Sequence, residues 1–215
     1  GAGFLATNCY NNTRPEFCQF VSRAPFTGPG TGALTVTQTY INVATDMVKG
    51  IDFTVRYDRD LGPGKLDMGA NVVKIIDRLN QNDPSFAATH FEGSIGNPKW
   101  AGTGHVGYDW GSWYARWGVD YIGGTDDDFL NDDGDFPPDV YDFSVDDYWL
   151  HTASVRFEPS NRYSLTLGVR NVFDKNPPKI TAEDPFVNTT SNVPLQSAWD
   201  FRGRTFFINA QAKVF

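Results

Sequence analysis

Basic residues are scarce in this 215-residue sequence, and it has no long apolar run. Its 18 Lys and Arg side chains are outnumbered by 26 Asp and Glu, which gives a formal net charge of -8. Because phosphates are neutralised by clustered Lys and Arg, we expect no nucleic-acid partner. No apolar run reaches the roughly 18 residues that a membrane-spanning helix needs. The absence of such a run does not exclude a transmembrane β-barrel, because its strands present only every second side chain to lipid.

Cysteine is almost absent. Cys9 and Cys18 are the two cysteines of the chain, and two is the smallest number that can form a bridge. In an oxidising compartment we expect a disulfide, and the alternative is two free thiols in a cytosolic loop. The chain begins at Gly1 without a Met or a basic segment followed by an apolar one, so we expect a processed or truncated product.

Helical periodicity is missing as well. The chain has 21 Gly and 13 Pro, which interrupt any long helical pattern, and 15% of its residues are aromatic. The odd-numbered residues from Ile51 to Tyr57 are apolar and alternate with polar ones, which is the period of a strand with one apolar face. Such alternation predicts an all-β fold with seven strands, over residues 36–59, 65–79, 97–110, 113–124, 147–158, 162–174 and 200–215.

The connections between these strands alternate in length. Short turns are expected near residues 61–64, 111–112 and 158–162, and long loops at about residues 81–96, 125–146 and 175–199. Outer-membrane barrels combine short periplasmic turns with longer extracellular loops. Each strand also supplies the roughly 9 to 11 residues of a tilted membrane strand. We therefore expect antiparallel transmembrane β-barrel strands over residues 34–215, after a loop segment over residues 1–33 that holds both cysteines.

An odd number of strands is unusual, because single-chain bacterial barrels have even numbers. Either residues 1–33 contain another strand, or the chain is part of a larger barrel. The aromatic residues lie near strand ends on the apolar parity, which favours membrane-interface girdles over the alternative of a sugar-stacking platform. These residues are Trp100, Trp110, Trp113, Trp117, Tyr121, Trp149 and Phe157.

Several segments resemble TonB-dependent outer-membrane receptors. The stretch that contains Gly168, Asn171, Phe173, Asp174 and Lys175 is similar to the Gly-x-x-Asn-Leu/Val-Phe-Asp-Lys motif that ends the family's penultimate strand at its outer rim. Gly203 and Arg204 resemble the Gly-Arg-x-Phe/Tyr opening of the last strand. Residues 40–52 and 97–100 resemble two earlier strand segments, and residues 9–18 resemble a cysteine-containing outer loop of some members.

The resemblance implies a barrel of about 22 strands, filled by an N-terminal plug, that imports scarce ligands. This chain lacks the plug and would supply the C-terminal part, about seven strands. The implied partners are outer-membrane lipid, the TonB complex through the missing plug, the barrel-assembly machinery and a small-molecule ligand (a ferric siderophore, cobalamin or a glycan). The implied location is the outer membrane of a Gram-negative bacterium, and no cofactor is expected.

The resemblance also implies an assembly signal at the C-terminus. In the family the terminal Phe usually shares the parity of the lipid-facing residues, but here the apolar parity from 206 to 214 is offset by one from Phe215. Phe207 shares the parity of Phe215, and a bulge near the end would reconcile the two patterns. We assign the signal to Phe207 and Phe215.

Charged residues of the strands fall on the polar parity. On a lipid-facing surface, an Arg near the midplane would cost about 2 to 4 kcal/mol, so their parity tests the barrel interpretation. We predict that five of them line the lumen together with His105: Asp52, Arg56, Asp109, Arg116 and Asp120.

The loop over residues 125–147 holds ten aspartates. Asp128, Asn131, Asp133 and Asp135 offer the oxygen ligands that Ca²⁺ prefers, but their spacing does not fit the twelve-residue calcium loop. A solvated acidic outer loop is therefore the favoured interpretation. The three histidines lack metal-ligand spacing, and no catalytic triad or acid pair is recognisable, so we predict neither a metal site nor an enzyme.

The favoured hypothesis is the C-terminal barrel part of a TonB-dependent receptor. One alternative is a self-contained small outer-membrane barrel, porin-like or structural, which requires a strand within residues 1–33. The other is a soluble secreted β-sandwich that binds carbohydrate, which would need no detergent.

Overall fold

The computed structural model describes residues 2–11, 14–24, 32–37, 45–81, 87–127, 140–181, 189–195 and 199–213. The chain divides into two compact units. Unit 1 comprises residues 1–46 and 80–89, and unit 2 comprises residues 47–79 and 90–215. In the described part of the chain, no helix has the length and apolar character needed to cross a membrane.

Unit 1 contains a short helix α1 (Ala2–Tyr10), a 3-10 helix η1 (Pro15–Phe20) and a small antiparallel sheet of β1 (Val21–Arg23) and β2 (Leu34–Val36). Cys9 and Cys18 form a disulfide that joins the two helices, with their Cα atoms 4.9 Å apart. Leu5 and Phe17 are buried. The expected loop therefore contains helices, and α1 is too short to give a periodic signal in the sequence.

The large sheet has the strand order β14-β11-β10-β7-β6-β4-β3, with β5 paired to β4. The pairings recorded between its long strands are antiparallel. The strand bounds are β3 (Thr45–Leu61), β4 (Gly64–Gln81), β5 (Thr89–His90), β6 (Trp100–Trp110), β7 (Trp113–Ile122), β10 (Tyr148–Ser160), β11 (Tyr163–Arg170) and β14 (Thr205–Ala212). All seven predicted strands are present, and β5 adds a short eighth.

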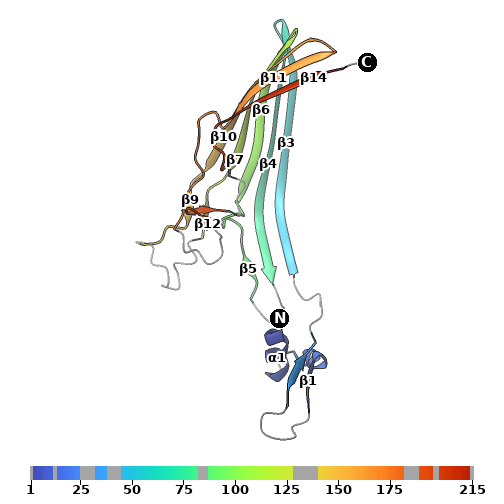
Figure 1. The fold of residues 1–215 in the computed structure, drawn as a ribbon, viewed down its shortest axis with the longest axis vertical. Helices are drawn as coiled ribbons and strands as arrows, with labels where there is room; N and C mark the ends of the chain where they lie inside the picture. Colours follow the sequence, from blue (N-terminus) through green and yellow to red (C-terminus); the bar gives the residue numbers. More distant parts are fainter. Residues whose placement is uncertain are drawn as a thin grey trace. The chain divides into compact units, whose positions relative to one another are not determined.

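The tight turns lie at one end of this sheet and the long connections at the other (Figure 1). The turns occupy residues 62–63, 111–112 and 161–162. Gly62 and Gly111 have φ values of +58° and +64°, a left-handed conformation that glycine adopts without steric cost. Among the described strands, short turns therefore alternate with longer connections.

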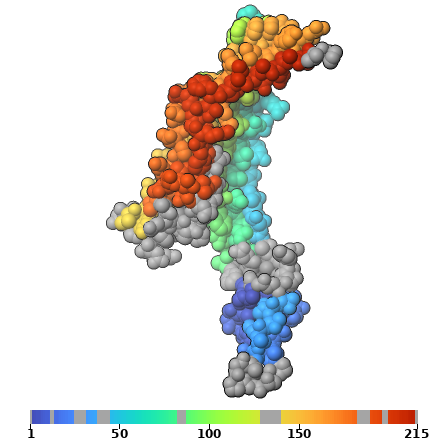
Figure 2. All heavy atoms as spheres, in the orientation of Figure 1, coloured from blue at the N-terminus to red at the C-terminus, as the bar shows by residue number. Residues whose placement is uncertain are grey.

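The sheet is curved, as its twist requires. In Figure 2, the orange and red strands β10, β11 and β14 lie across the cyan and green ones. Among the described residues, β14 and β3 each pair on one side only, so the sheet is open. β1 and β2 form a separate sheet, and no described strand of residues 1–33 joins the large one.

The described parts of the long connections form further secondary structure. They contain two small antiparallel sheets, one of β8 (Thr125–Asp126) with β9 (Ser144–Val145), the other of β12 (Thr189–Thr190) with β13 (Val193–Pro194). A buried apolar cluster joins them to the end of β10, and it consists of Ile95, Phe143, Val145, Tyr148, Leu150, Ile180, Val193 and Trp199. The main core of unit 2 therefore lies at the loop end of the sheet.

Candidate functional site

One face of the large sheet is apolar and exposed. The strand register aligns one residue from each of six strands in a row across this face: Met68, Val106, Trp117, Ala153, Val169 and Phe206. The fractional exposure of Phe206 is 74%, and that of Ile208 beside it is 71%. Contiguous exposed apolar surface marks a contact with lipid or with protein. We call this surface the apolar face.

Aromatic side chains meet in pairs at two levels of this face. The rings of Trp113 and Phe157 are 4.5 Å apart, and those of Tyr121 and Trp149 are 4.3 Å apart. From 149 to 157, β10 advances about 26 Å at roughly 3.3 Å per residue. A strand tilt of about 40° reduces this to about 20 Å along the membrane normal, close to the apolar band of about 25 Å. Two separate levels fit the predicted girdles better than a single sugar platform.

The opposite face, which we call the polar face, carries the six residues that were predicted to line a lumen. In β6 and β7, the register places four of them opposite in parity to Val106 and Trp117: His105, Asp109, Arg116 and Asp120. In β3, the Thr54 hydroxyl donates to Asn71 Oδ1 at 3.0 Å, which places the even-numbered residues Asp52 and Arg56 on the same face.

Polar side chains on this face contact one another. His105 Nε2 lies 3.2 Å from Asp67 Oδ2. The Tyr114 hydroxyl donates to the same carboxylate oxygen at 3.2 Å, and the Arg156 guanidinium lies 5.1 Å from the centre of the Tyr114 ring. His105 thus lies beside a carboxylate within a network of mixed charge.

A hollow of about 670 Å³ opens on the polar face toward the loop end. The indole Nε1 of the buried Trp199 has no hydrogen-bond partner among the described residues, and the atom itself is inaccessible to solvent. Both signs of charge line the hollow, beside aromatic rings. Its lining includes Asn71, Asp120, Tyr148, Arg170, Trp199 and Asp200. Such a lining, mostly apolar with a few charged groups, suits a small molecule that has both apolar and polar parts.

Asn171 ends β11 and closes the turn that follows it. Its φ is +53°, and its side chain is fully buried. Its Nδ2 donates to the Lys175 carbonyl at 2.9 Å, while the Lys175 N–H donates to its Oδ1 at 2.7 Å. Asn tolerates the left-handed conformation better than most residues, and here it also satisfies two backbone groups. β11 therefore stops at Arg170, before the predicted end at residue 174.

Asp174 connects this turn to the next strand. Its Oδ1 accepts the backbone N–H of Arg204 at 2.8 Å. Gly203 has φ +70°, and a Cβ there would lie 3.1 Å from the same carboxylate oxygen. The Gly203–Arg204 segment therefore packs directly against Asp174. The Phe173 side chain is exposed to solvent, with a fractional exposure of 65%.

Gly168 makes room for Phe207. A Cβ at residue 168 would overlap the Phe207 ring, and the register pairs the two residues across β11 and β14. Phe207 therefore lies on the polar face, while Phe206 lies on the apolar one. The register of β14 has no bulge between Thr205 and Ala212, so Phe207 does not take the lipid-facing parity of the family's signal. Phe215 is outside the described residues, and its part in the assembly signal stays a prediction.

Trp117, His151 and Phe173 form a group that the sequence did not predict. Trp117 Nε1 donates to His151 Nδ1 at 3.2 Å, and the rings of His151 and Phe173 are 5.0 Å apart. Its members come from β7, β10 and the turn after β11. They are far apart in the sequence, so no local spacing of residues predicts the group. It places an imidazole nitrogen that accepts a hydrogen bond from Trp117 on the apolar face.

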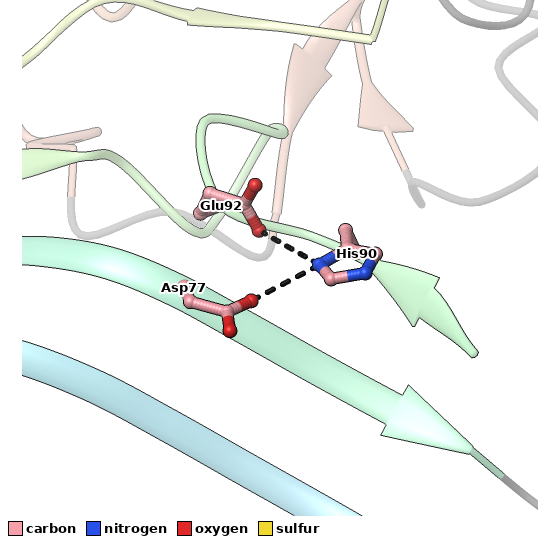
Figure 3. A group of neighbouring side chains, drawn as sticks. All are labelled: Asp77, His90 and Glu92. Atoms are coloured by element: carbon pink, nitrogen blue, oxygen red, sulfur yellow. Dashed lines mark hydrogen bonds and ion pairs between the residues drawn. The ribbon is translucent and has the colours of Figure 1, made fainter.

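A second such group lies near the loop end of β4. Asp77 comes from β4, His90 from β5 and Glu92 from the turn after it, and one ligand atom of each lies within 4.8 Å of the others (Figure 3). Asp77 is separated from His90 by twelve residues of sequence, so no metal-ligand spacing was visible. The four calcium candidates, Asp128, Asn131, Asp133 and Asp135, lie outside the described residues.

Asp142 is the described aspartate of the acidic loop whose pKa is shifted. The Ser144 hydroxyl and backbone N–H both donate to its Oδ1, at 2.7 and 3.0 Å. These hydrogen bonds stabilise the carboxylate and hold the pKa of Asp142 below its usual value. The acidic loop is thus turned back on itself at this point.

Comparison with known proteins identifies the family. The family model described as TonB dependent receptor-like, beta-barrel matches residues 3–172. The chain belongs to this family. The match confirms the resemblance seen in the sequence and the antiparallel barrel fold class, and TonB-dependent receptors are transport receptors rather than enzymes. Gly203 and Arg204 lie beyond the matched range.

Two solved structures are similar to the chain, both of mutants of the ferric enterobactin receptor of Pseudomonas aeruginosa. One is 15% identical, with a TM-score of 0.47, and the match covers 78% of this chain and 22% of that one. The other is 14% identical, with a TM-score of 0.48, and the match covers 89% and 25%. The chain thus matches a quarter or less of either receptor chain. No curated protein matches it.

Proposed function

We propose that this chain forms about seven C-terminal strands in the wall of an outer-membrane receptor that takes up a scarce ligand in a TonB-dependent manner. The observation that carries the proposal is the opposite chemistry of the two faces of one sheet. Apolar residues run in register across six strands on one face, and charged residues occupy the other. The proposed location is the outer membrane of a Gram-negative bacterium.

The apolar face is proposed to contact lipid. In a β-sandwich, this face would pack on a second sheet, but the other sheets of the described residues have two strands each. A hollow of about 870 Å³ on this face is lined almost wholly by apolar groups, which suits acyl chains rather than a polar ligand. Placing Arg56 and Arg116 on the polar face avoids the cost of a charge in lipid.

The two edges of the sheet need partner strands. Within a bilayer, an unpaired backbone N–H or C=O costs several kcal/mol because no water replaces its partner. β14 and β3 are the edges of the described sheet, so we propose that the rest of the barrel pairs with both. A self-contained barrel is disfavoured, because β1 and β2 pair with each other instead. The barrel-assembly machinery is proposed to close the cylinder, reading the terminal Phe215.

The ligand is proposed to bind at the loop end of the polar face. The hollow beside Trp199 offers aromatic rings and side chains of both charges on a mostly apolar lining. The ligand classes that suit the family are ferric siderophores, cobalamin and glycans. Uptake would be non-covalent: binding at the loops and lumen, followed by movement of the plug when the TonB complex acts on it.

The experiment is an uptake assay in cells that produce the full-length protein. Labelled ferric siderophores, cobalamin and an oligosaccharide are offered separately to cells with the gene, without it, and with the gene but without TonB. We expect uptake of one class to require both the protein and TonB. Uptake of all three classes that is unchanged by loss of the protein, or uptake through it that continues without TonB, would refute the proposal.

A further inference from the structure

Asp77, His90 and Glu92 converge on one point (Figure 3). His90 Nδ1 lies 3.0 Å from Asp77 Oδ1 and 3.9 Å from Glu92 Oε2. The carboxylates are largely shielded, with side-chain exposures of 22% and 23%, while His90 is 55% exposed. Two acids from different segments therefore face a single imidazole nitrogen at a point that solvent reaches from one side.

One proton on His90 Nδ1 cannot form good hydrogen bonds with both carboxylates. A single N–H at Nδ1 donates well to one acceptor, and an oxygen at 3.9 Å lies beyond hydrogen-bond range. The second carboxylate is then left near the first, with like charges repelling. A cation placed between the three atoms attracts both carboxylates and accepts the lone pair of Nδ1.

The distances suit such a cation. Zinc bonds to imidazole nitrogen and carboxylate oxygen are about 2.0 to 2.2 Å, so two ligands of a tetrahedral site are about 3.4 Å apart. The two measured separations, 3.0 and 3.9 Å, bracket this value. The three ligand atoms all lie within 4.8 Å of one another, so side-chain shifts of about one ångström would complete three positions of a tetrahedron, with water at the fourth.

Neighbouring groups orient the two carboxylates. Lys49 Nζ lies 3.4 Å from Asp77 Oδ2, the oxygen that faces away from His90. The backbone N–H of Arg78 donates to Glu92 Oε2 at 3.3 Å. Hydrogen bonds of this kind fix the ligands of metal sites, and each leaves lone pairs on the carboxylate for the ion.

We propose that Asp77, His90 and Glu92 bind one divalent transition-metal ion of the zinc class. One imidazole nitrogen and two carboxylate oxygens suit zinc, whereas calcium and magnesium prefer oxygen ligands alone. The ion would join β4, β5 and the turn after β5 at the loop end of the sheet. This proposal is independent of the ligand that the receptor transports.

The test is equilibrium dialysis of the full-length protein in detergent against Zn²⁺. His90→Ala removes the nitrogen ligand. Glu92→Gln removes a charge but keeps an oxygen for the Arg78 N–H. His105→Ala is the matched control, because His105 faces the single carboxylate of Asp67.

We expect the wild-type protein and the His105→Ala variant to bind one more Zn²⁺ per molecule than the His90→Ala variant. Loss of an outer partner of a metal ligand weakens binding about 10- to 100-fold, so loss of the ligand itself should weaken it by at least about 100-fold. The Glu92→Gln variant should also bind more weakly. Equal binding by the wild-type protein and both site variants would overturn the proposal, as would an equal loss in the His105→Ala control.

Discussion

Replacing Asn171 by Ala should open the turn that ends β11. The substitution removes two hydrogen bonds to Lys175, each of which contributes about 0.5 to 1.5 kcal/mol. It also leaves a residue with a Cβ at φ +53° without the local side-chain bonds that favour Asn there, at a cost of about 1 kcal/mol. The sum is a local loss of about 2 to 4 kcal/mol.

The assay is hydrogen exchange at the Lys175 amide, whose acceptor is Asn171 Oδ1. Because each 1.4 kcal/mol is a factor of ten, its protection should fall by about 30- to 1,000-fold. Asn171→Gly should recover about 1 kcal/mol of the loss, since Gly adopts a positive φ without strain. Asn171→Asp retains the acceptor for the Lys175 N–H but loses the donor to the Lys175 carbonyl. The Lys175 amide should therefore stay better protected in this variant than in Asn171→Ala or Asn171→Gly.

Unchanged exchange at Lys175 in the Asn171→Ala variant would refute this reasoning. It would mean that the buried side chain does not hold the turn. Equal protection in the Asn171→Asp and Asn171→Ala variants would contradict the assignment of Oδ1 as the acceptor.

Two further predictions concern the faces of the sheet and the acidic loop. Ile208→Arg should lower the free energy of unfolding in lipid vesicles by about 2 kcal/mol, while Asn209→Arg on the polar face should change it by less than about 0.5 kcal/mol; equal effects would contradict the two-face assignment. Because the pKa of Asp142 is lowered by folding, its contribution to loop stability is present above the unfolded pKa of about 3.9 and is lost as pH falls through the folded value. The protection factor of the Ser144 amide should therefore fall on acidification below about pH 4, and Asp142→Asn should remove that pH dependence.

The sequence predicts the large sheet well, because a strand with one apolar and one polar face has alternating apolar and polar residues. The alternation over Ile51–Tyr57 and its equivalents located all seven long strands. Strand ends were less predictable: β11 stops at Arg170 because Asn171 turns the chain, and β14 begins at Thr205 rather than at residue 200.

Groups that form across the sheet or between loops were not predictable. His151 meets Trp117 only because β10 pairs with β7 in one register. Asp77 meets His90 only because the chain returns to pair β5 with β4. The buried cluster at the loop end gathers residues from 95 to 199, which have no common period in the sequence.

The central claim is that, along each strand, every second side chain contacts lipid and the side chains between them contact water. Both cysteines of this chain are paired in the Cys9–Cys18 disulfide, so a cysteine introduced into β10 is the one free thiol within residues 1–215. Spin labels placed one at a time at residues 152, 153, 154 and 155 of the full-length receptor in lipid vesicles would be exposed to oxygen, which concentrates in lipid, and to a water-soluble relaxation agent. We predict greater oxygen accessibility at 153 and 155 and greater water-soluble-agent accessibility at 152 and 154; equal accessibility at all four positions, or the reverse alternation, would contradict the account.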